Sequence, residues 1–213
     1  MERNRLTAFF EGTICILGVW IFALCINRES IFQYTAYGGL LLAAIVISRS
    51  IHNLSSLLSL FGITPFNRKV LFYVLAGIAF GGLLAILCNY LSEDNILPVH
   101  LKKFALIAPL IGITEELVFR GYVQTKMAAI GSLLSIGIAS TGHTMYKYLV
   151  IKTLPDDLRV NYFLLILLTF IVGVVFGILR DRSKSVLPAA SAHALFDVIV
   201  YGGIVMAPVW VWT

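Results

Sequence analysis

The apolar stretch from Phe104 to Val123 contains three ionisable residues at short spacing. Glu115 and Glu116 are adjacent, and Arg120 follows four residues after the second of them. A charged side chain near the centre of a bilayer costs about 3 kcal/mol even on the more lenient insertion scale, so such residues mark functional sites by default. Their position therefore predicts a polar site inside a membrane.

The two glutamates point in different directions if the stretch is an α-helix, because each residue advances by about 100°. Glu116 and Arg120 share a face at i, i+4, in the order that favours an ion pair. Glu115 is then left to face the interior of a helix bundle, where a neighbouring imidazole can tune its affinity for a proton. Glu115 is thus a candidate general base. The alternative is that both carboxylates only hold helices together.

Two histidines lie in later apolar stretches. His143 occurs in the sequence STGHT, where it could also serve as a hydrogen-bonding residue between helices. His193 occurs in AASAHALFD, whose small residues permit close helix approach, and Asp197 shares its face at i, i+4. An imidazole beside a carboxylate suits metal ligation, orientation of the imidazole, or stabilisation of an oxyanion. Glu115, His143 and His193 lie at similar depths of roughly 10 to 18 Å in their predicted helices, so we expect them to converge.

The composition is that of a polytopic membrane protein. Of 213 residues, 59% are hydrophobic and 13% are charged, whereas soluble domains carry about 25% charged residues. A spanning helix needs about 20 mainly apolar residues, and about seven segments approach that length. We predict an all-α fold, a transmembrane helical bundle of about seven spans with its active site buried within the membrane. The predicted spans are Leu6–Ile26, Tyr34–Ile47, Val70–Leu91, Phe104–Tyr122, Leu133–Val150, Tyr162–Leu179 and Val186–Ala207.

The segment between the second and third predicted spans has a different pattern. In Ile51–Ile63, leucines recur at helical spacing among serines, which is typical of an interfacial amphipathic helix; a membrane hairpin is the alternative. We therefore predict two parts of the chain. Residues 1–69 form N-terminal accessory transmembrane segments with this interfacial helix, and residues 70–213 form the core that holds the polar site.

The distribution of Lys and Arg over the loops predicts the orientation of the chain. If the N-terminus is cytoplasmic, nine basic residues fall on that side and six on the other, so we expect the C-terminus outside, in a plasma (inner) membrane. This bias accounts for the formal net charge of +5, and it favours the lipid bilayer, not nucleic acid, as a partner. The cytoplasmic group is Arg3, Arg5, Arg49, Arg68, Lys69, Lys126, Arg180, Arg182 and Lys184, and the opposite group is Arg28, Lys102, Lys103, Lys147, Lys152 and Arg159.

At these polar residues the chain resembles the CAAX protease and bacteriocin-processing family of intramembrane proteases, also called the CPBP or Abi family or type II CAAX endopeptidases. The family hallmark E-E-x-x-x-R matches residues 115–120. A second motif, F-x-x-x-H, matches at His143 but has Ala139 at its aromatic position. A third, His followed four residues later by Asn or Asp, matches His193 and Asp197. The resemblance covers about Val70 to Met206.

The resemblance implies an enzyme, an intramembrane endopeptidase that hydrolyses a peptide bond of a membrane-embedded, membrane-anchored or lipidated peptide or protein. In the family's pattern Glu115 and His143 activate water. His193 and Asp197 support the oxyanion, and Glu116 and Arg120 shape the site. An ionised Asp197 cannot donate a hydrogen bond to an oxyanion as Asn could, so we expect it to orient His193 or to help bind a cation.

The sequence leaves the cofactor and the function class open. Glu115, His143, His193 and Asp197 offer nitrogen and oxygen ligands that suit Zn²⁺, and the family is often labelled metalloprotease, but the soluble H-E-x-x-H signature is absent. We favour a glutamate-activated water with no required cofactor, with Zn²⁺ as the alternative. A transporter or proton-relay protein could use the same residues, although no related halves with broken helices are evident. A catalytically silent scaffold with a protease-like fold is a further alternative.

Overall fold

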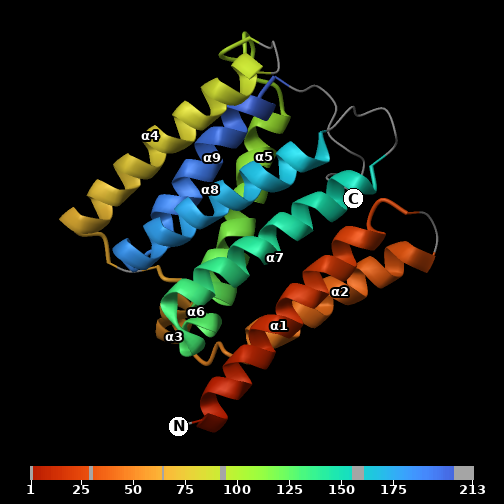
Figure 1. The fold of residues 1–213 in the computed structure, drawn as a ribbon, viewed down its shortest axis with the longest axis vertical. Coiled ribbons are helices and arrows are strands. Elements are labelled where there is room, and N and C mark those ends of the chain that lie inside the picture. The colour runs from red at the N-terminus through yellow and green to blue at the C-terminus, as the bar shows by residue number, and fades with distance from the viewer. Residues whose placement is uncertain (1, 29–30, 64, 92–94, 155–160, 204–213) are drawn as a thin grey trace. The chain divides into compact units, whose positions relative to one another are not determined.

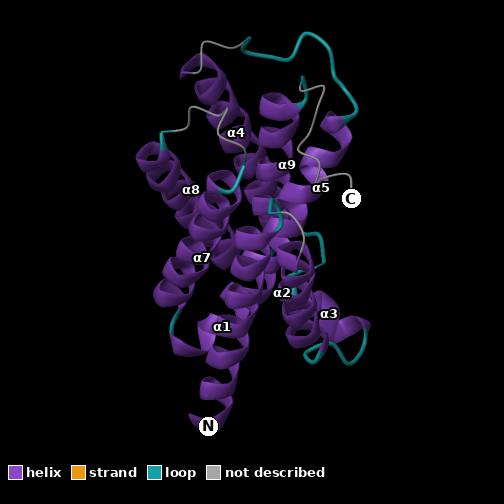
Figure 2. Ribbon diagram, turned by 90° about the vertical axis from the view of Figure 1, so that its right-hand side faces the viewer, coloured by secondary structure: helices purple, strands orange, loops and turns teal. Residues whose placement is uncertain are grey.

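Helices form all of the regular secondary structure in the described part of the chain, which comprises residues 2–28, 31–63, 65–91, 95–154 and 161–203 of a computed structural model (Figures 1 and 2). The predicted all-α fold is thereby confirmed. Arg159 and the end of the last predicted span, residues 204–207, lie outside the described residues.

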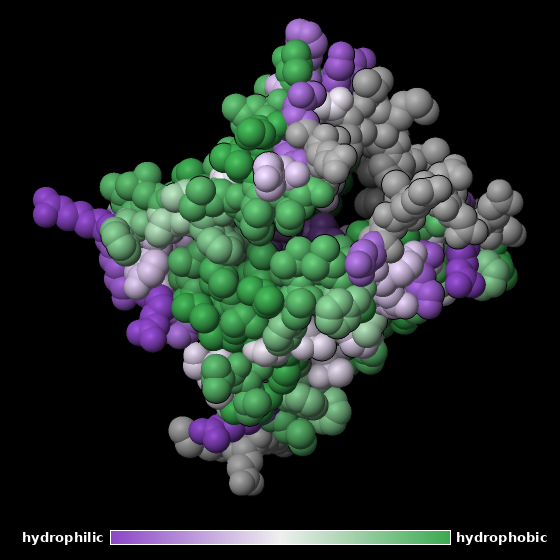
Figure 3. All heavy atoms as spheres, turned by 45° about the horizontal axis from the view of Figure 1, so that its top comes forward, coloured by the Kyte–Doolittle hydropathy of each residue, from purple (hydrophilic) through white to green (hydrophobic). Residues whose placement is uncertain are grey.

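Four of the described helices are long and apolar enough to cross a bilayer. The second of them has 18 residues and is therefore longer than the 14-residue span that the sequence predicts there. Between 17% and 33% of the most apolar window of each helix is buried, so most of these side chains face outwards, and Figure 3 shows apolar residues over much of the visible face. Hydrocarbon chains accommodate such a surface and water does not. The chain is an integral membrane protein, and these helices are α1 (Glu2–Cys25), α2 (Ile31–Ser48), α4 (Arg68–Leu91) and α8 (Tyr162–Ser183).

The chain divides into two compact units, and the first comprises Met1–Phe61 and Phe119–Ile178. In this unit α1 packs against α2 and against α7 (Ser132–Lys152). The indole nitrogen of Trp20 donates to the carbonyl of Gly142 at 2.9 Å, and the Asn27 amide donates to the carbonyl of Val150 at 3.2 Å. These bonds lie two helical turns apart along α7, so α1 and the turn that follows it fix the position of the helix that carries His143.

The helix that carries the two glutamates changes its winding directly after them. α5 (Phe104–Glu116) ends at Glu116, and a π-helix, η1 (Leu117–Val123), replaces the single α-helix that the sequence analysis assumed. The short helices α6 (Gln124–Met127) and η2 (Ala128–Ile130) follow. A π-turn holds more residues than an α-turn and is found frequently at functional sites. Side-chain directions that are inferred from a rotation of about 100° per residue therefore apply up to Glu116 and not to the residues that follow it.

The second unit comprises Gly62–Val118 and Leu179–Thr213, and its main contacts are made by α9 (Leu187–Tyr201). This helix packs against both α4 and α5 (Figure 1). Pro188 lies in the first turn of α9, where a missing N–H is tolerated. On α4, Gly77 and Gly81 lie against the backbone of Pro188 and Ala192. Because glycine has no Cβ, the two backbones approach each other as small residues allow in membrane helices.

We expect Gly81→Ala to destabilise the protein and Gly82→Ala to be tolerated. A Cβ on Gly81 would lie 2.8 Å from the carbonyl carbon of Ala192 and closer still to its oxygen, whereas a Cβ on Gly82 would meet only the end of the Leu195 side chain, at 3.4 Å. Overpacking against rigid backbone costs about 1–3 kcal/mol. The midpoint of thermal unfolding of the purified proteins measures the difference. Equal midpoints for the two variants would contradict close packing of α4 on α9.

Candidate functional site

A buried cluster of three carboxylates and one imidazole lies in the second unit. Glu115 and Glu116 are the last two residues of α5, and His193 and Asp197 lie one turn apart on α9. Nδ1 of His193 is 3.0 Å from Oε1 of Glu116. Its Nε2 is 3.8 Å from Oε2 of Glu115 and 3.7 Å from Oδ1 of Asp197. All four side chains are buried, with 7% exposure or less.

Close packing of α5 against α9 makes this cluster possible. Gly112, one turn before Glu116, faces α9 at the level of His193 and Asp197. A Cβ at this position would lie 3.0 Å from Cδ2 of His193 and would clash with Oδ2 of Asp197. The absence of a side chain on Gly112 therefore gives the imidazole and the carboxylate the space that they occupy.

A second buried polar pair lies in the first unit. Nη1 of Arg120, on η1, is 2.7 Å from Nδ1 of His143, on α7. Arg120 is fully buried and His143 is 4% exposed. The imidazole packs beside two aromatic rings, with centroid distances of 4.9 Å to Phe119 and 6.4 Å to Tyr146, and those two rings also pack on each other at 5.9 Å. The histidine ring is thus held by a charged donor at one nitrogen and by packing in an aromatic cluster.

The partners of the two histidines determine which ring nitrogen carries the proton. A guanidinium can only donate hydrogen bonds, so Nδ1 of His143 accepts from Arg120 and the ring proton resides on Nε2. An ionised carboxylate can only accept, so Nδ1 of His193 donates to Glu116. The two imidazoles therefore present different groups to their surroundings: His143 presents an Nε2–H donor, and His193 presents Nε2 to Glu115 and Asp197.

Part of the predicted convergence is observed within single units. The structure brings Glu115, His193 and Asp197 together, and it gives His143 a buried polar partner. The pairing of Glu115 with His143 stays a prediction, as does the ion pair of Glu116 with Arg120, because each joins residues of different units. Sequence reasoning missed the contact of Glu116 with His193, and it missed Gly112. The signal that could have indicated both is the glycine one turn before the acidic pair, because a glycine permits close approach to a helix that is rich in small residues.

The partners of the two histidines suit a catalytic zinc site only in part. Among the described side chains, no group of three or more His, Cys, Asp or Glu is arranged to hold a metal ion. A metal-bound histidine almost always donates its second ring N–H to a carboxylate, carbonyl or water. His193 has such a partner in Glu116, whereas Nδ1 of His143 accepts from a cation instead. We therefore derive no catalytic step through a metal.

Apolar helices long enough to span a bilayer, together with a buried acid–imidazole cluster and a buried arginine–imidazole pair, define an integral membrane protein with polar groups among its helices. Comparison with family models gives a match for part of the chain. Residues 97–199 match the model described as type II CAAX prenyl endopeptidase, Rce1-like. Residues 97–199 are therefore similar to Rce1-like type II CAAX prenyl endopeptidases, in agreement with the resemblance that the sequence motifs indicate. The family implies a peptidase. No curated protein and no solved structure matches the chain.

The matched segment includes every residue that the sequence analysis placed in the polar site. It begins after α4 and ends within α9, so it is shorter than the stretch from Val70 to Met206 over which we noted the resemblance. The six residues inside it are Glu115, Glu116, Arg120, His143, His193 and Asp197.

Proposed function

We propose that the protein is an intramembrane endopeptidase that hydrolyses a peptide bond of a membrane-embedded, membrane-anchored or lipidated substrate with water activated by Glu115. The observation that carries the proposal is the buried contact of His193 with Glu115, Glu116 and Asp197 inside a segment that matches a peptidase family. We further propose about seven spans, a site within the membrane, and a cytoplasmic N-terminus with the C-terminus outside a plasma (inner) membrane.

In the proposed reaction Glu115 removes a proton from water as the water oxygen forms a bond to the scissile carbonyl carbon. The carbonyl oxygen becomes an oxyanion, which hydrogen-bond donors stabilise. The oxyanion then collapses, the C–N bond breaks, and the leaving nitrogen takes up the proton that Glu115 removed. The products are a new carboxyl group and a new amine. No covalent enzyme intermediate and no cofactor are needed, and Zn²⁺ remains the alternative that the assay below tests.

The two histidines support this reaction in different ways. With Arg120 bonded to its Nδ1, His143 acts as a hydrogen-bond donor through Nε2–H, which leaves Glu115 as the base. Arg120 is then a positioning residue, because it acts through His143. Glu116 and Asp197 orient His193, whose Nε2 can donate to the oxyanion when it is protonated.

We expect His143→Gln to keep more activity than His143→Ala. A glutamine amide can accept from Arg120 and still donate an N–H, whereas alanine can do neither. Removal of one donor to an oxyanion costs about 10²- to 10³-fold in kcat, so the alanine variant should lose that much and the glutamine variant clearly less. Initial cleavage rates at saturating substrate measure both. If the two variants are equally impaired, His143 does not act as a donor.

The experiment that tests the function is reconstitution of the purified protein with a panel of membrane-anchored peptides. Cleavage by the wild-type protein is compared with that of Glu115→Ala, His143→Ala and His193→Ala. Equal behaviour of all four proteins, in cleavage and in cells, would rule out the peptidase assignment. Treatment with a chelator, verified metal removal and addition of zinc in the same assay test the metal question, since retained activity excludes an obligatory metal.

A further inference from the structure

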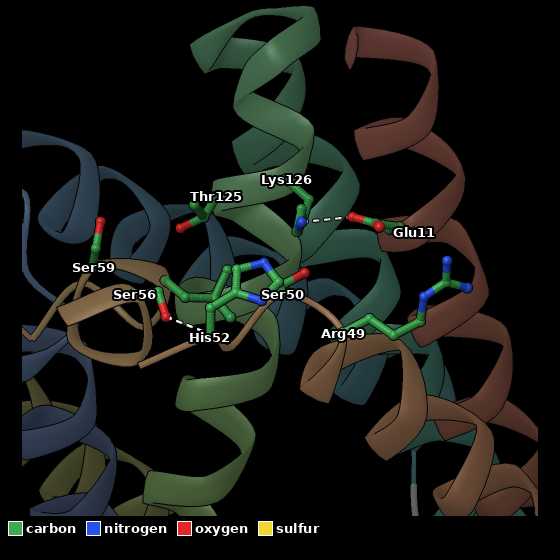
Figure 4. A pocket seen from close by; sticks show the side chains of 9 residues that line it. Glu11, Arg49, Ser50, His52, Ser56, Ser59, Thr125 and Lys126 are labelled. Atoms are coloured by element: carbon green, nitrogen blue, oxygen red, sulfur yellow. Dashed lines mark hydrogen bonds and ion pairs between the residues drawn. The ribbon is translucent and has the colours of Figure 1, made fainter. Parts of the chain in front are cut away.

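The first unit contains a polar cavity, and none of its lining residues belongs to the buried polar groups around His143 and His193. Its volume is about 400 Å³, and it is open to the surroundings, so that a ligand can enter it. It is formed where α2 ends, by the connection to α3 (Leu54–Leu60), by α3 itself, by α6 and by the N-terminal half of α1 (Figure 4). Its lining residues are Glu11, Arg49, Ser50, His52, Ser56, Ser59, Leu60, Thr125 and Lys126.

The charges around the cavity favour an anion. Arg49 and Lys126 contribute two positive charges and Glu11 one negative charge, so the lining carries a net charge of +1 with His52 neutral. The single carboxylate in the lining is already used, because Oε2 of Glu11 lies 2.5 Å from Nζ of Lys126. Figure 4 shows these two side chains directed toward each other from α1 and α6. A cation would find no further carboxylate here, whereas an anion would meet the guanidinium of Arg49, several hydroxyl groups and an ammonium that it would share with Glu11.

The walls of the cavity are held in place by contacts of their own. The hydroxyl of Tyr122 donates to the carbonyl of Val46 at 3.1 Å and ties the end of α2 to the turn before α6. The turn from His52 to Ser56 is closed by a capping box, in which Asn53 accepts from the Ser56 N–H at 2.8 Å and Ser56 accepts from the Asn53 N–H at 2.9 Å. The polar groups are therefore presented by an ordered loop.

The position of the cavity along the chain indicates which anion it meets. Arg49 directly follows Ser48, the last residue of α2, which is long and apolar enough to span a bilayer. The end of a spanning helix lies in the headgroup region of the membrane, where lipid phosphates are concentrated. Arg49 and Lys126 also belong to the group that the loop charges place on the cytoplasmic side, where anionic lipids attract basic side chains.

We propose that this cavity binds a phosphate group, supplied by the headgroup of an anionic phospholipid, with Arg49 and Lys126 as the binding cations. Guanidinium groups match the geometry of phosphate oxygens and bind them in a bidentate manner. The side chains of Ser50 and Ser59 line the same space. The site is independent of the peptidase proposal, because none of its residues belongs to the buried polar groups around His143 and His193.

The test uses the full chain, purified in detergent and mixed with phosphatidylcholine or with phosphatidylglycerol. Native mass spectrometry counts the phospholipids that each protein retains. We expect wild type to retain phosphatidylglycerol over phosphatidylcholine, and Arg49→Gln to reduce this retention by about tenfold, as the loss of a charge-assisted hydrogen bond predicts. Glu11→Gln should increase retention, because it removes the negative charge from the lining. Arg68→Gln is the matched control, since Arg68 is exposed and lies outside the cavity.

A second arm distinguishes a lipid from free phosphate. Inorganic phosphate is titrated into the detergent-solubilised protein by calorimetry, with Arg49→Gln alongside. Binding of phosphate that depends on Arg49, without selective lipid retention, would support the site and identify its ligand as soluble phosphate. If wild type, Arg49→Gln and Glu11→Gln retain the same lipids and bind phosphate equally, the proposal is wrong. Because the Glu11 and Arg49 variants are expected to change binding in opposite directions, a general loss of folding cannot imitate the predicted result.

Discussion

Glu115→Gln should reduce cleavage by about three orders of magnitude while the protein remains folded. Glutamine has the same shape as glutamate but cannot take a proton from water, and general bases contribute about 10²- to 10⁴-fold to a rate. The substitution removes one of three carboxylates around His193, so it also relieves repulsion between like charges in the cluster. We therefore expect the midpoint of thermal unfolding to stay the same or to rise slightly.

The neighbouring substitution Glu116→Gln separates the two glutamates. A glutamine oxygen can still accept from Nδ1 of His193, so the ring keeps its orientation, and we expect a loss of only about tenfold in kcat. Glu116→Ala should lower stability as well, because it leaves a buried N–H donor without its acceptor, at a cost of about 1–3 kcal/mol. From the sequence alone, Glu116 is expected to form an ion pair with Arg120. The observed contact of Glu116 with His193 is the reason to expect that Glu116→Ala lowers stability.

Initial rates on a membrane-anchored peptide and unfolding midpoints of the same preparations measure these differences. Asp181→Asn is the matched control, since Asp181 pairs with Lys184 near the end of α8 and lies outside both polar clusters. The assignment of Glu115 as the base fails if Glu116→Gln is the more damaging of the two glutamine variants. It also fails if Asp181→Asn is as impaired as Glu115→Gln.

The helices were predictable because a membrane restricts the choice of structure. Backbone groups in hydrocarbon must bond within their own segment, so a long apolar stretch implies a helix. The third predicted span, Val70–Leu91, differs from α4 by two residues at its start and coincides at its end. The interfacial segment Ile51–Ile63 contains a helix, but α3 has only seven residues because Asn53 caps it late and Phe61 ends it.

The details of the site were less predictable, because they depend on local winding and on contacts between distant segments. The sequence indicated which residue types gather, since isolated charges in apolar helices need partners. It could not reveal that α-helical geometry ends at Glu116, because a π-helix differs from an α-helix by one residue per turn. The bond between Glu116 and His193 joins residues 77 positions apart. It arises from packing of α5 on α9, which local spacing does not encode.

Gly112→Ala should impair both stability and cleavage, although it adds a single methyl group. The new Cβ would lie 3.0 Å from Cδ2 and 3.1 Å from Cγ of His193, and it would clash with Oδ2 of Asp197. Either α5 moves away from α9 or the two side chains leave their positions. Overpacking of this kind costs about 1–3 kcal/mol. Displacement of catalytic groups by about 1 Å can cost 10²-fold in rate, so we expect a comparable loss of kcat.

The matched control for Gly112→Ala is Gly137→Ala, which adds the same methyl group to α7 where no atom lies within 4 Å of the new Cβ. In a helix this change should be neutral or stabilising by about 0.5–1 kcal/mol. A double variant, Gly112→Ala with Asp197→Ala, removes the carboxylate that the methyl group meets, so it should recover part of the lost stability without recovering cleavage. If Gly112→Ala has wild-type rates and stability, α5 and α9 do not pack as closely as described. The absence of a side chain at Gly112 would then not explain the positions of His193 and Asp197.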